Sequence, residues 1–102
     1  MELTVNDIIE INKTILSTQL HNHSTHHEGI SANRYLVKEI LDDAKQLESV
    51  FDQAAYVLAA IPWAQPFSGG NKRTAFAAAK IILAEKNHIM KKISQHDIEF
   101  LL

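Results

Sequence analysis

The chain has 102 residues, a length that suits one domain with a single core. Apolar residues make up 46% and charged residues 22%, as in soluble globular proteins, and the absence of cysteine excludes disulfide scaffolds and thiol chemistry. The net charge of −2 gives no reason to expect nucleic acid or a membrane as a partner, and the first residues lack a signal-peptide pattern. We therefore expect one cytoplasmic domain over residues 1–102.

Hydrophobic periodicity predicts a first helix over residues 5–20, in which Asn12 falls off the apolar face. Thr4 and Asp7 have the spacing of a capping pair at its start. Residues 21–30 break the pattern and indicate a loop. The apolar face is expected to hold Ile8, Ile11, Ile15, Leu16 and Leu20.

A second helix is expected after Ser31 or Asn33, either of which can cap it. A third helix is expected over residues 49–61, with Pro62 ending it, because proline interrupts the hydrogen bonds of a helix. Residues 62–70 then form a tight connection with two prolines and two glycines. The second helix has an apolar stripe made of Leu36, Val37, Ile40, Leu41, Ala44 and Leu47.

Residues 71–86 predict a central helix that is apolar on nearly every side, so we expect it to lie buried among the others. Ser94 and Asp97 mark the start of another helix, which the end of the chain cuts off. The apolar ending over residues 100–102 indicates either a fragment or an end that packs on a partner. These elements predict an all-α, single-domain bundle of about five helices.

The charge and glycine pattern points to an anion site in the second half of the chain. Residues 1–52 carry a net charge of −5 and residues 53–102 a net charge of +3. Two glycines precede the helix at Asn71, and Lys72 and Arg73 stand in its first turn, where the helix dipole disfavours cations. Unpaired amides at a helix start bind phosphate or carboxylate readily. The alternative is a Gly-Gly turn with two solvated basic residues.

The same segment resembles the signature of the Fic/Doc family in its death-on-curing form, which is His-x-Phe-x-Asp-Gly-Asn-Lys-Arg-Thr-Ala. The residues that carry the resemblance are Pro66-Phe67-Ser68-Gly69-Gly70-Asn71-Lys72-Arg73-Thr74-Ala75. A looser likeness extends over about residues 4–88. The resemblance implies an all-α fold with the motif loop between two core helices, which agrees with the periodicity.

The resemblance also implies roles. Proteins of this family transfer an adenylyl or phosphoryl group from ATP or another nucleotide to a hydroxyl group of a target protein. By position, Gly69, Gly70, Asn71, Lys72 and Arg73 correspond to the phosphate-binding loop. Phe67 corresponds to the apolar anchor behind the loop. A protein target or an antitoxin-like partner, and a nucleotide or another anion, are the ligands implied.

Two positions depart from the family pattern. Gln65 stands where the family has the histidine that acts as general base, and a glutamine amide is not basic near neutral pH. Gly69 stands where the family has the carboxylate that holds Mg²⁺, so we expect no metal ligand there. The loop for the anion is retained while the base and the metal ligand are absent. We therefore expect an impaired transferase.

A weaker resemblance involves Glu28. The stretch from Ser24 to Gly29 fits the pattern of an inhibitory helix found in many Fic proteins, in which a glutamate pairs with a second arginine of the motif. Phe76 occupies that arginine position here, so the partner of Glu28 is missing.

Three further residues, His23, His27 and Trp63, are candidates for binding a ligand. His23 and His27 have a spacing that binds zinc or nickel on a helix, but an exposed polar loop is the favoured interpretation, and no metal site is expected. Trp63 could stack on a base, but a residue that fills the core is favoured.

Three functional hypotheses remain. The first is a Fic/Doc-fold protein with reduced transferase activity that still binds a nucleotide or another anion. The second is a non-enzymatic interaction protein that uses the fold as a scaffold, for example in a toxin–antitoxin-type system. The third is an active transferase with a relocated base. Binding of pyrophosphate or ATP that depends on Arg73 separates the first two.

Overall fold

Four helices make up the described part of the chain in a computed structural model that describes residues 1–22 and 32–86. Residues 1–22 and 32–86 contain no strand, which confirms the all-α prediction. The fifth helix, expected from Ser94, lies outside the described residues. The helices are α1 (Val5–Asn22), α2 (Arg34–Lys45), α3 (Val50–Ala64) and α4 (Asn71–Lys86).

Polar side chains fix where the first three helices begin. Thr4 and Asp7 cap α1 reciprocally, because the Thr4 amide donates to Asp7 Oδ2 (2.9 Å) and the Asp7 amide to Thr4 Oγ1 (3.1 Å). Asn33 is the residue that caps α2, where its Oδ1 accepts from the Leu36 amide at 3.1 Å. Ser49 caps α3. The predicted capping pair at Thr4 is confirmed, and Asn33 is selected from the two candidates for α2.

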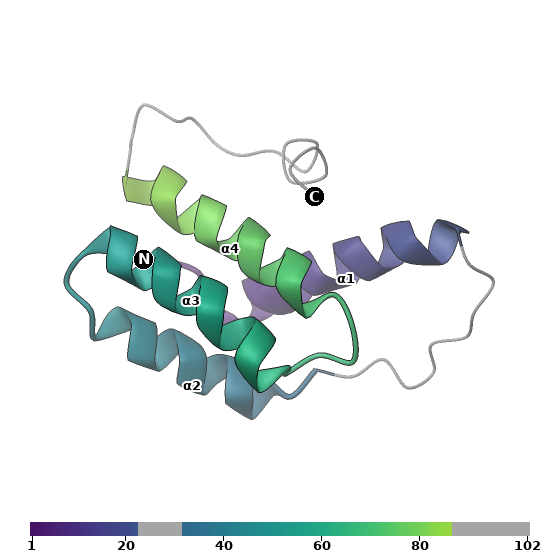
Figure 1. The fold of residues 1–102 in the computed structure, drawn as a ribbon, viewed down its shortest axis with the longest axis horizontal. Coiled ribbons are helices and arrows are strands. Elements are labelled where there is room, and N and C mark those ends of the chain that lie inside the picture. The colour runs from purple at the N-terminus through teal and green to yellow at the C-terminus, as the bar shows by residue number, and fades with distance from the viewer. Residues whose placement is uncertain (23–31, 87–102) are drawn as a thin grey trace.

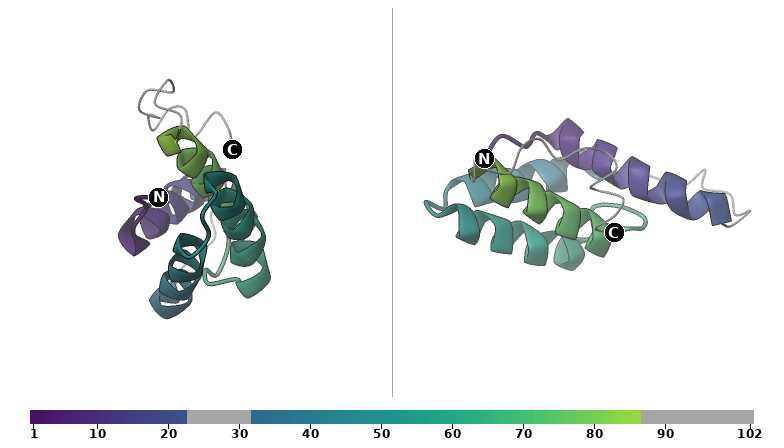
Figure 2. Two further views of the ribbon diagram at one scale, coloured as in Figure 1. Left: turned by 90° about the vertical axis from the view of Figure 1, so that its left-hand side faces the viewer. Right: turned by 90° about the horizontal axis from the view of Figure 1, so that it is seen from above.

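The third and fourth helices form the centre of the molecule. They lie side by side and run in opposite directions, α2 packs along α3, and α1 crosses α4 (Figures 1 and 2). Apolar side chains form the core between these helices, and the largest fully buried ones are Ile8, Ile15, Val37, Val57, Ile61 and Ile82. The loop between α3 and α4 therefore lies between the two central helices, as the sequence predicted.

Two predictions about the central helices need correction. Pro62 does not end α3, which continues to Ala64, and the Gln65 amide still donates to the Ile61 carbonyl oxygen at 2.9 Å. The helix ends where Pro66 disfavours a right-handed helical conformation at the preceding residue. The expectation that α4 is buried on nearly every side holds only in part, because Phe76 is 39% exposed.

Among the residues that the structure describes, no helix combines the length and the hydropathy needed to cross a membrane.

Candidate functional site

The segment from Gln65 to Gly70 connects the two central helices as a tightly bent loop. Gln65 takes a left-handed conformation with φ 51° and ψ 60° and ends α3, while Gly70 has φ 72° and immediately precedes α4. Asn71 is the first residue of α4, as expected from the sequence. The two glycines of the loop, Gly69 and Gly70, therefore lie immediately before the first residue of α4.

Phe67 anchors this loop in the core. Its side chain is 4% exposed, which agrees with the anchoring role expected for it. Its backbone forms an isolated bridge with Ala32, and next to it the Asn33 amide donates to the Pro66 carbonyl oxygen at 2.7 Å. The loop is thereby fastened to the residues that lead into α2.

The side chain of Asn71 closes the loop on itself. Its Oδ1 accepts from the Phe67 amide at 3.1 Å, and its Nδ2 donates to the Phe67 carbonyl oxygen at 3.0 Å. The side-chain amide of Asn71 is thus engaged both as an acceptor and as a donor. Its side chain holds the shape of the loop.

A buried asparagine from another helix supports the loop from behind. Asn12 of α1 is 3% exposed, and its Nδ2 donates to the Gly69 carbonyl oxygen at 2.8 Å and to Thr74 Oγ1 at 3.1 Å. The prediction that Asn12 falls off the buried face of its helix is wrong. The spacing in the sequence indicates this burial, because Asn12 stands four residues after Ile8 and four before Leu16 and therefore lies on the same helix face.

The backbone amides at the start of α4 point away from internal partners. Thr74 is the first residue here whose amide donates within the helix, to the Gly70 carbonyl oxygen at 2.9 Å. No described residue accepts a hydrogen bond from the amides of residues 69–73. These amides carry the positive end of the helix dipole, so an anion is the ligand that suits them.

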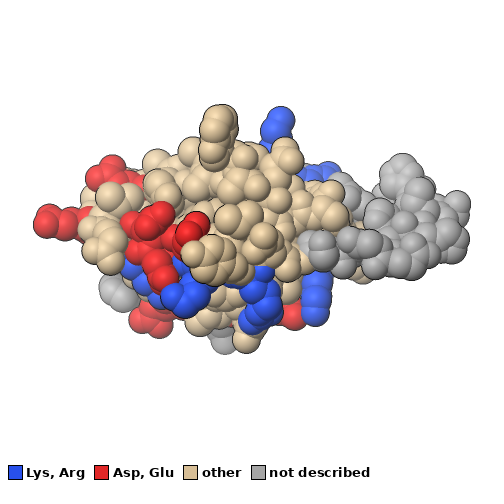
Figure 3. Space-filling model, turned by 90° about the horizontal axis from the view of Figure 1, so that it is seen from below, with Lys and Arg blue, Asp and Glu red and all other residues tan. Residues whose placement is uncertain are grey.

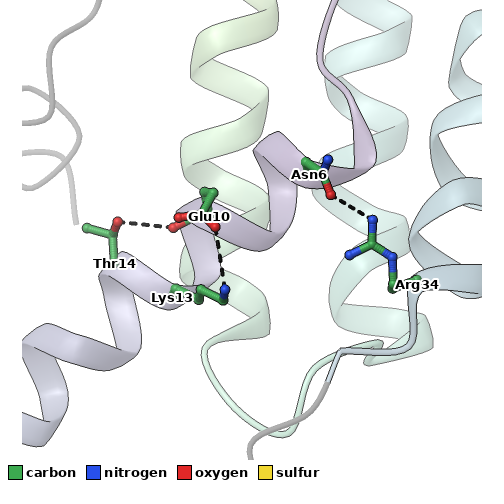
Figure 4. Close-up of polar contacts among 5 residues, drawn as sticks. All are labelled: Asn6, Glu10, Lys13, Thr14 and Arg34. Carbon is green, nitrogen blue, oxygen red and sulfur yellow. Dashed lines mark hydrogen bonds and ion pairs between the residues drawn. The ribbon is translucent and has the colours of Figure 1, made fainter.

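The two basic residues of this first turn are exposed. Within the described part of the chain, neither Lys72 nor Arg73 makes an ion pair or a side-chain hydrogen bond. Arg34, which is the first residue of α2, behaves differently: its Nη2 donates to Asn6 Oδ1 at 2.6 Å (Figure 4). Lys72 and Arg73 are therefore available to a ligand, whereas Arg34 is engaged by its own chain.

The loop does not fit a bound Mg²⁺. Gly69 has no side-chain oxygen, and its carbonyl oxygen already accepts the hydrogen bond from Asn12. No group of three histidine, aspartate or glutamate side chains that could hold a metal ion occurs within residues 1–22 and 32–86.

The remaining residues that the sequence singled out do not gather at the loop. Gln65 is exposed at the C-terminal end of α3, beside the loop in sequence. Glu28, His23 and His27 lie outside the described residues. Trp63 does not fill the core, because it is 89% exposed. That prediction is wrong because α3 continues past Pro62 and turns the Trp63 side chain to its outer face.

A cavity of about 300 Å³ lies far from this loop. It is lined by Met1, Glu2, Glu48, Val50, Gln53 and Glu85. Glu85 belongs to the last turn of α4, about 20 Å from the first turn at 1.5 Å per residue. Three glutamates line the cavity, so it is not suited to bind an anion.

These features define an all-α domain with a glycine-containing, basic loop between its two central helices. The family model described as Fic/DOC family matches residues 2–83, and the chain belongs to this family. A search of curated proteins found no match, and neither did a search of solved structures.

Proposed function

We propose that this Fic/Doc-fold protein binds the phosphate groups of a nucleotide, or a similar anion, at the start of α4, and that its transferase activity is impaired. The observation that carries the proposal is the set of backbone amides over residues 69–73 with no acceptor in the described chain, next to exposed Lys72 and Arg73. Amides at a helix start and two cations are complementary to phosphate in both geometry and charge.

The loop is suited to this role because it is held in shape before any ligand arrives. Asn71 ties its ends together, Asn12 fixes Gly69, and Phe67 is fastened in the core. A rigid set of donors loses little conformational entropy when an anion binds. The retained loop therefore supports binding without requiring the missing groups.

The impairment rests on two positions. An activated hydroxyl needs a proton acceptor, and removing a general base typically lowers a rate by about 10²–10⁴-fold. Gln65 supplies no such acceptor at the position of the family's histidine, and Gly69 supplies no carboxylate for Mg²⁺. Binding without efficient transfer is the outcome that this residue set favours. An antitoxin-like protein or a former target protein is the partner class that the family membership suggests.

Titration of pyrophosphate and of ATP, followed by calorimetry, tests the proposal. We expect saturable binding to the wild type and a loss of about tenfold or more in affinity for Arg73→Ala, since a charge-assisted hydrogen bond contributes about 1.5–3 kcal/mol. Arg34→Ala is the matched control, because Arg34 also stands in the first turn of a helix but donates to Asn6. No saturable binding by the wild type would contradict the proposal.

A second candidate function, an interaction protein that uses the fold as a scaffold, is favoured by the exposed apolar side chains of α3, of which Trp63 is 89% exposed. Absence of anion binding in a folded protein would favour this alternative.

A further inference from the structure

The solvent-exposed side of α4 carries a row of cations around one aromatic ring. Lys72, Arg73 and Phe76 are exposed, and Lys80 is partly buried. Lys80 stands seven residues after Arg73, so at about 3.6 residues per turn the two cations lie on nearly the same line along the helix. Phe76 lies between the directions of Lys72 and Arg73 around the helix axis. The row therefore extends the basic first turn of α4 along the same side of the helix.

The ring of Phe76 holds Lys80 towards the start of α4. The Nζ of Lys80 lies 5.7 Å from the centroid of the Phe76 ring, which makes this a cation–π contact. Side chains of a helix lean towards its N-terminal end, and the contact brings the ammonium group of Lys80 back by one turn, to the level of Phe76. Phe76 follows Arg73 by three residues, which corresponds to about 4.5 Å along the helix axis. The ammonium group therefore lies about one turn from the cations of the first turn.

Within the described part of the chain, no acidic side chain is paired with this row. Lys72, Arg73 and Lys80 form no ion pair with a described residue. Glu85, the only acidic residue of α4, stands twelve residues after Arg73 and so points about 120° away from it around the helix axis. Acidic side chains gather instead at the end of the molecule where α3 begins, on the left of Figure 3, whereas α4 starts towards the opposite end (Figure 1). The positive charge of the row is therefore available to a ligand.

We propose that Lys80 is a specificity-determining residue of the anion site, and that it binds the outer phosphate of a ligand whose inner phosphates occupy the amides over residues 69–73. This inference rests on the proposed function, because it adds a cation along the same ligand. A chain of condensed phosphates spreads its charge over several bonds, and cations placed one turn apart are complementary to such a chain. The contact with Phe76 orders the ammonium group before the ligand arrives, which lowers the entropy lost on binding. The site therefore favours chains of three phosphates over chains of two.

Calorimetric titration of the full chain with pyrophosphate and with tripolyphosphate tests the proposal. We expect Lys80→Gln to lower the affinity for tripolyphosphate by about threefold to fivefold, and the affinity for pyrophosphate by less than about twofold. Lys45→Gln is the matched control, because it removes the same charge from an exposed lysine of α2. We expect the control to change both affinities by less than about twofold.

The same titrations separate the role of Lys80 from the function on which it rests. Saturable pyrophosphate binding that depends on Arg73, with equal affinities of Lys80→Gln and Lys45→Gln for tripolyphosphate, would overturn the role of Lys80 and leave the proposed function intact. Equal losses for both ligands in Lys80→Gln would also overturn the proposed selectivity. If the wild type bound neither ligand saturably, both proposals would be overturned.

Replacement of the aromatic ring tests how Lys80 is held in place. Phe76→Leu keeps an apolar side chain but removes the ring face, so we expect it to weaken tripolyphosphate binding by about twofold. The same substitution added to Lys80→Gln should have no further effect, because the two residues act through one contact. Thermal unfolding checks that each variant is folded. An equal loss from Phe76→Leu with and without Lys80 would overturn the role assigned to the contact.

Discussion

The side-chain amide of Asn12 donates a hydrogen bond of 2.8 Å to the carbonyl oxygen of Gly69, which lies 57 residues further along the chain. The same nitrogen also donates to Thr74 Oγ1 at 3.1 Å, one turn into α4. A single buried group from α1 thus holds both the loop and the helix that follows it. The amides of the neighbouring residues 69–73 have no acceptor among the described residues.

Replacement of Asn12 is expected to affect both stability and the loop. Asn12→Ala leaves Gly69 and Thr74 without their donor, and we expect the free energy of unfolding to fall by about 1–3 kcal/mol. We also expect weaker pyrophosphate binding and faster hydrogen exchange of the Phe67 and Thr74 amides, which donate to Asn71 Oδ1 and to the Gly70 carbonyl oxygen. Denaturant unfolding, amide exchange and calorimetry measure the three effects.

Gln53→Ala is the matched control for Asn12→Ala. Gln53 is another buried amide, 9% exposed, and its Nε2 donates to the Leu47 carbonyl oxygen at 2.8 Å near the start of α3. We expect comparable destabilisation without any change in anion affinity. If both variants weakened binding equally, Asn12 would matter only through overall stability.

Replacement by alanine should destabilise the protein more at Gly70 than at Gly69. A Cβ on Gly70 would lie 3.3 Å from both Asn12 Nδ2 and Ile15 Cγ2, at a φ of 72° that disfavours side chains, so Gly70→Ala should cost about 1–3 kcal/mol. A Cβ on Gly69 would meet only Leu16 Cδ2, at an ordinary 3.6 Å, so Gly69→Ala should change stability by no more than about 1 kcal/mol. Thermal unfolding of both variants distinguishes these effects, and equal losses would contradict the geometry.

Chelation of divalent cations should leave nucleotide binding nearly unchanged. The position of the family's metal ligand is Gly69, which provides no carboxylate. Titration of ATP with EDTA and with MgCl₂ should therefore give affinities within about threefold of each other. A tenfold loss with EDTA would mean that another carboxylate of the chain holds the metal.

Restoring both missing groups should restore transfer. Gln65→His supplies a base, at a left-handed position that histidine tolerates better than most residues, and Gly69→Asp supplies a metal ligand at a position with room for a side chain. We expect the double variant to label a protein hydroxyl when incubated with ATP in a lysate, while each single variant does little because both groups act on one step. Label from the α-phosphate indicates adenylylation, and label from the γ-phosphate indicates phosphorylation.

The control for this experiment adds Arg73→Ala to the double variant, which should abolish the labelling if the retained loop binds the nucleotide. A folded double variant that binds ATP but transfers no label would show that the loss of activity is not confined to positions 65 and 69. Phe76, at the position of the family's second arginine, would then be the next residue to replace by arginine.

Local patterns were sufficient to predict the helices and the loop. The capping pair at Thr4 and the start of α4 at Asn71 follow from residues close in sequence, and the structure confirms both. The burial of Phe67 was implied by the resemblance to the family motif, and the structure agrees with it. The role of Asn12 could not be predicted, because its partners are 57 and 62 residues away and only the packing of α1 on α4 brings them together.

Predictions that treated single residues in isolation were less successful. Pro62 was expected to stop α3, but one missing amide is tolerated when the next turn can still form its hydrogen bond from Gln65 to Ile61. Trp63 was expected in the core on the basis of its residue type, yet its position on the outer face of the continued helix leaves it exposed. Both errors have one cause, which is the position of the helix end.

The central claim is that the amides at the start of α4 bind an anion, and mapping of backbone amide chemical shifts during titration with pyrophosphate tests it most directly. We expect the largest changes in chemical shift to fall on residues 69–73, to saturate together, and to disappear in Arg73→Ala but persist in Arg34→Ala. Changes that are absent, or that spread over exposed lysines and arginines elsewhere without saturating, would contradict it.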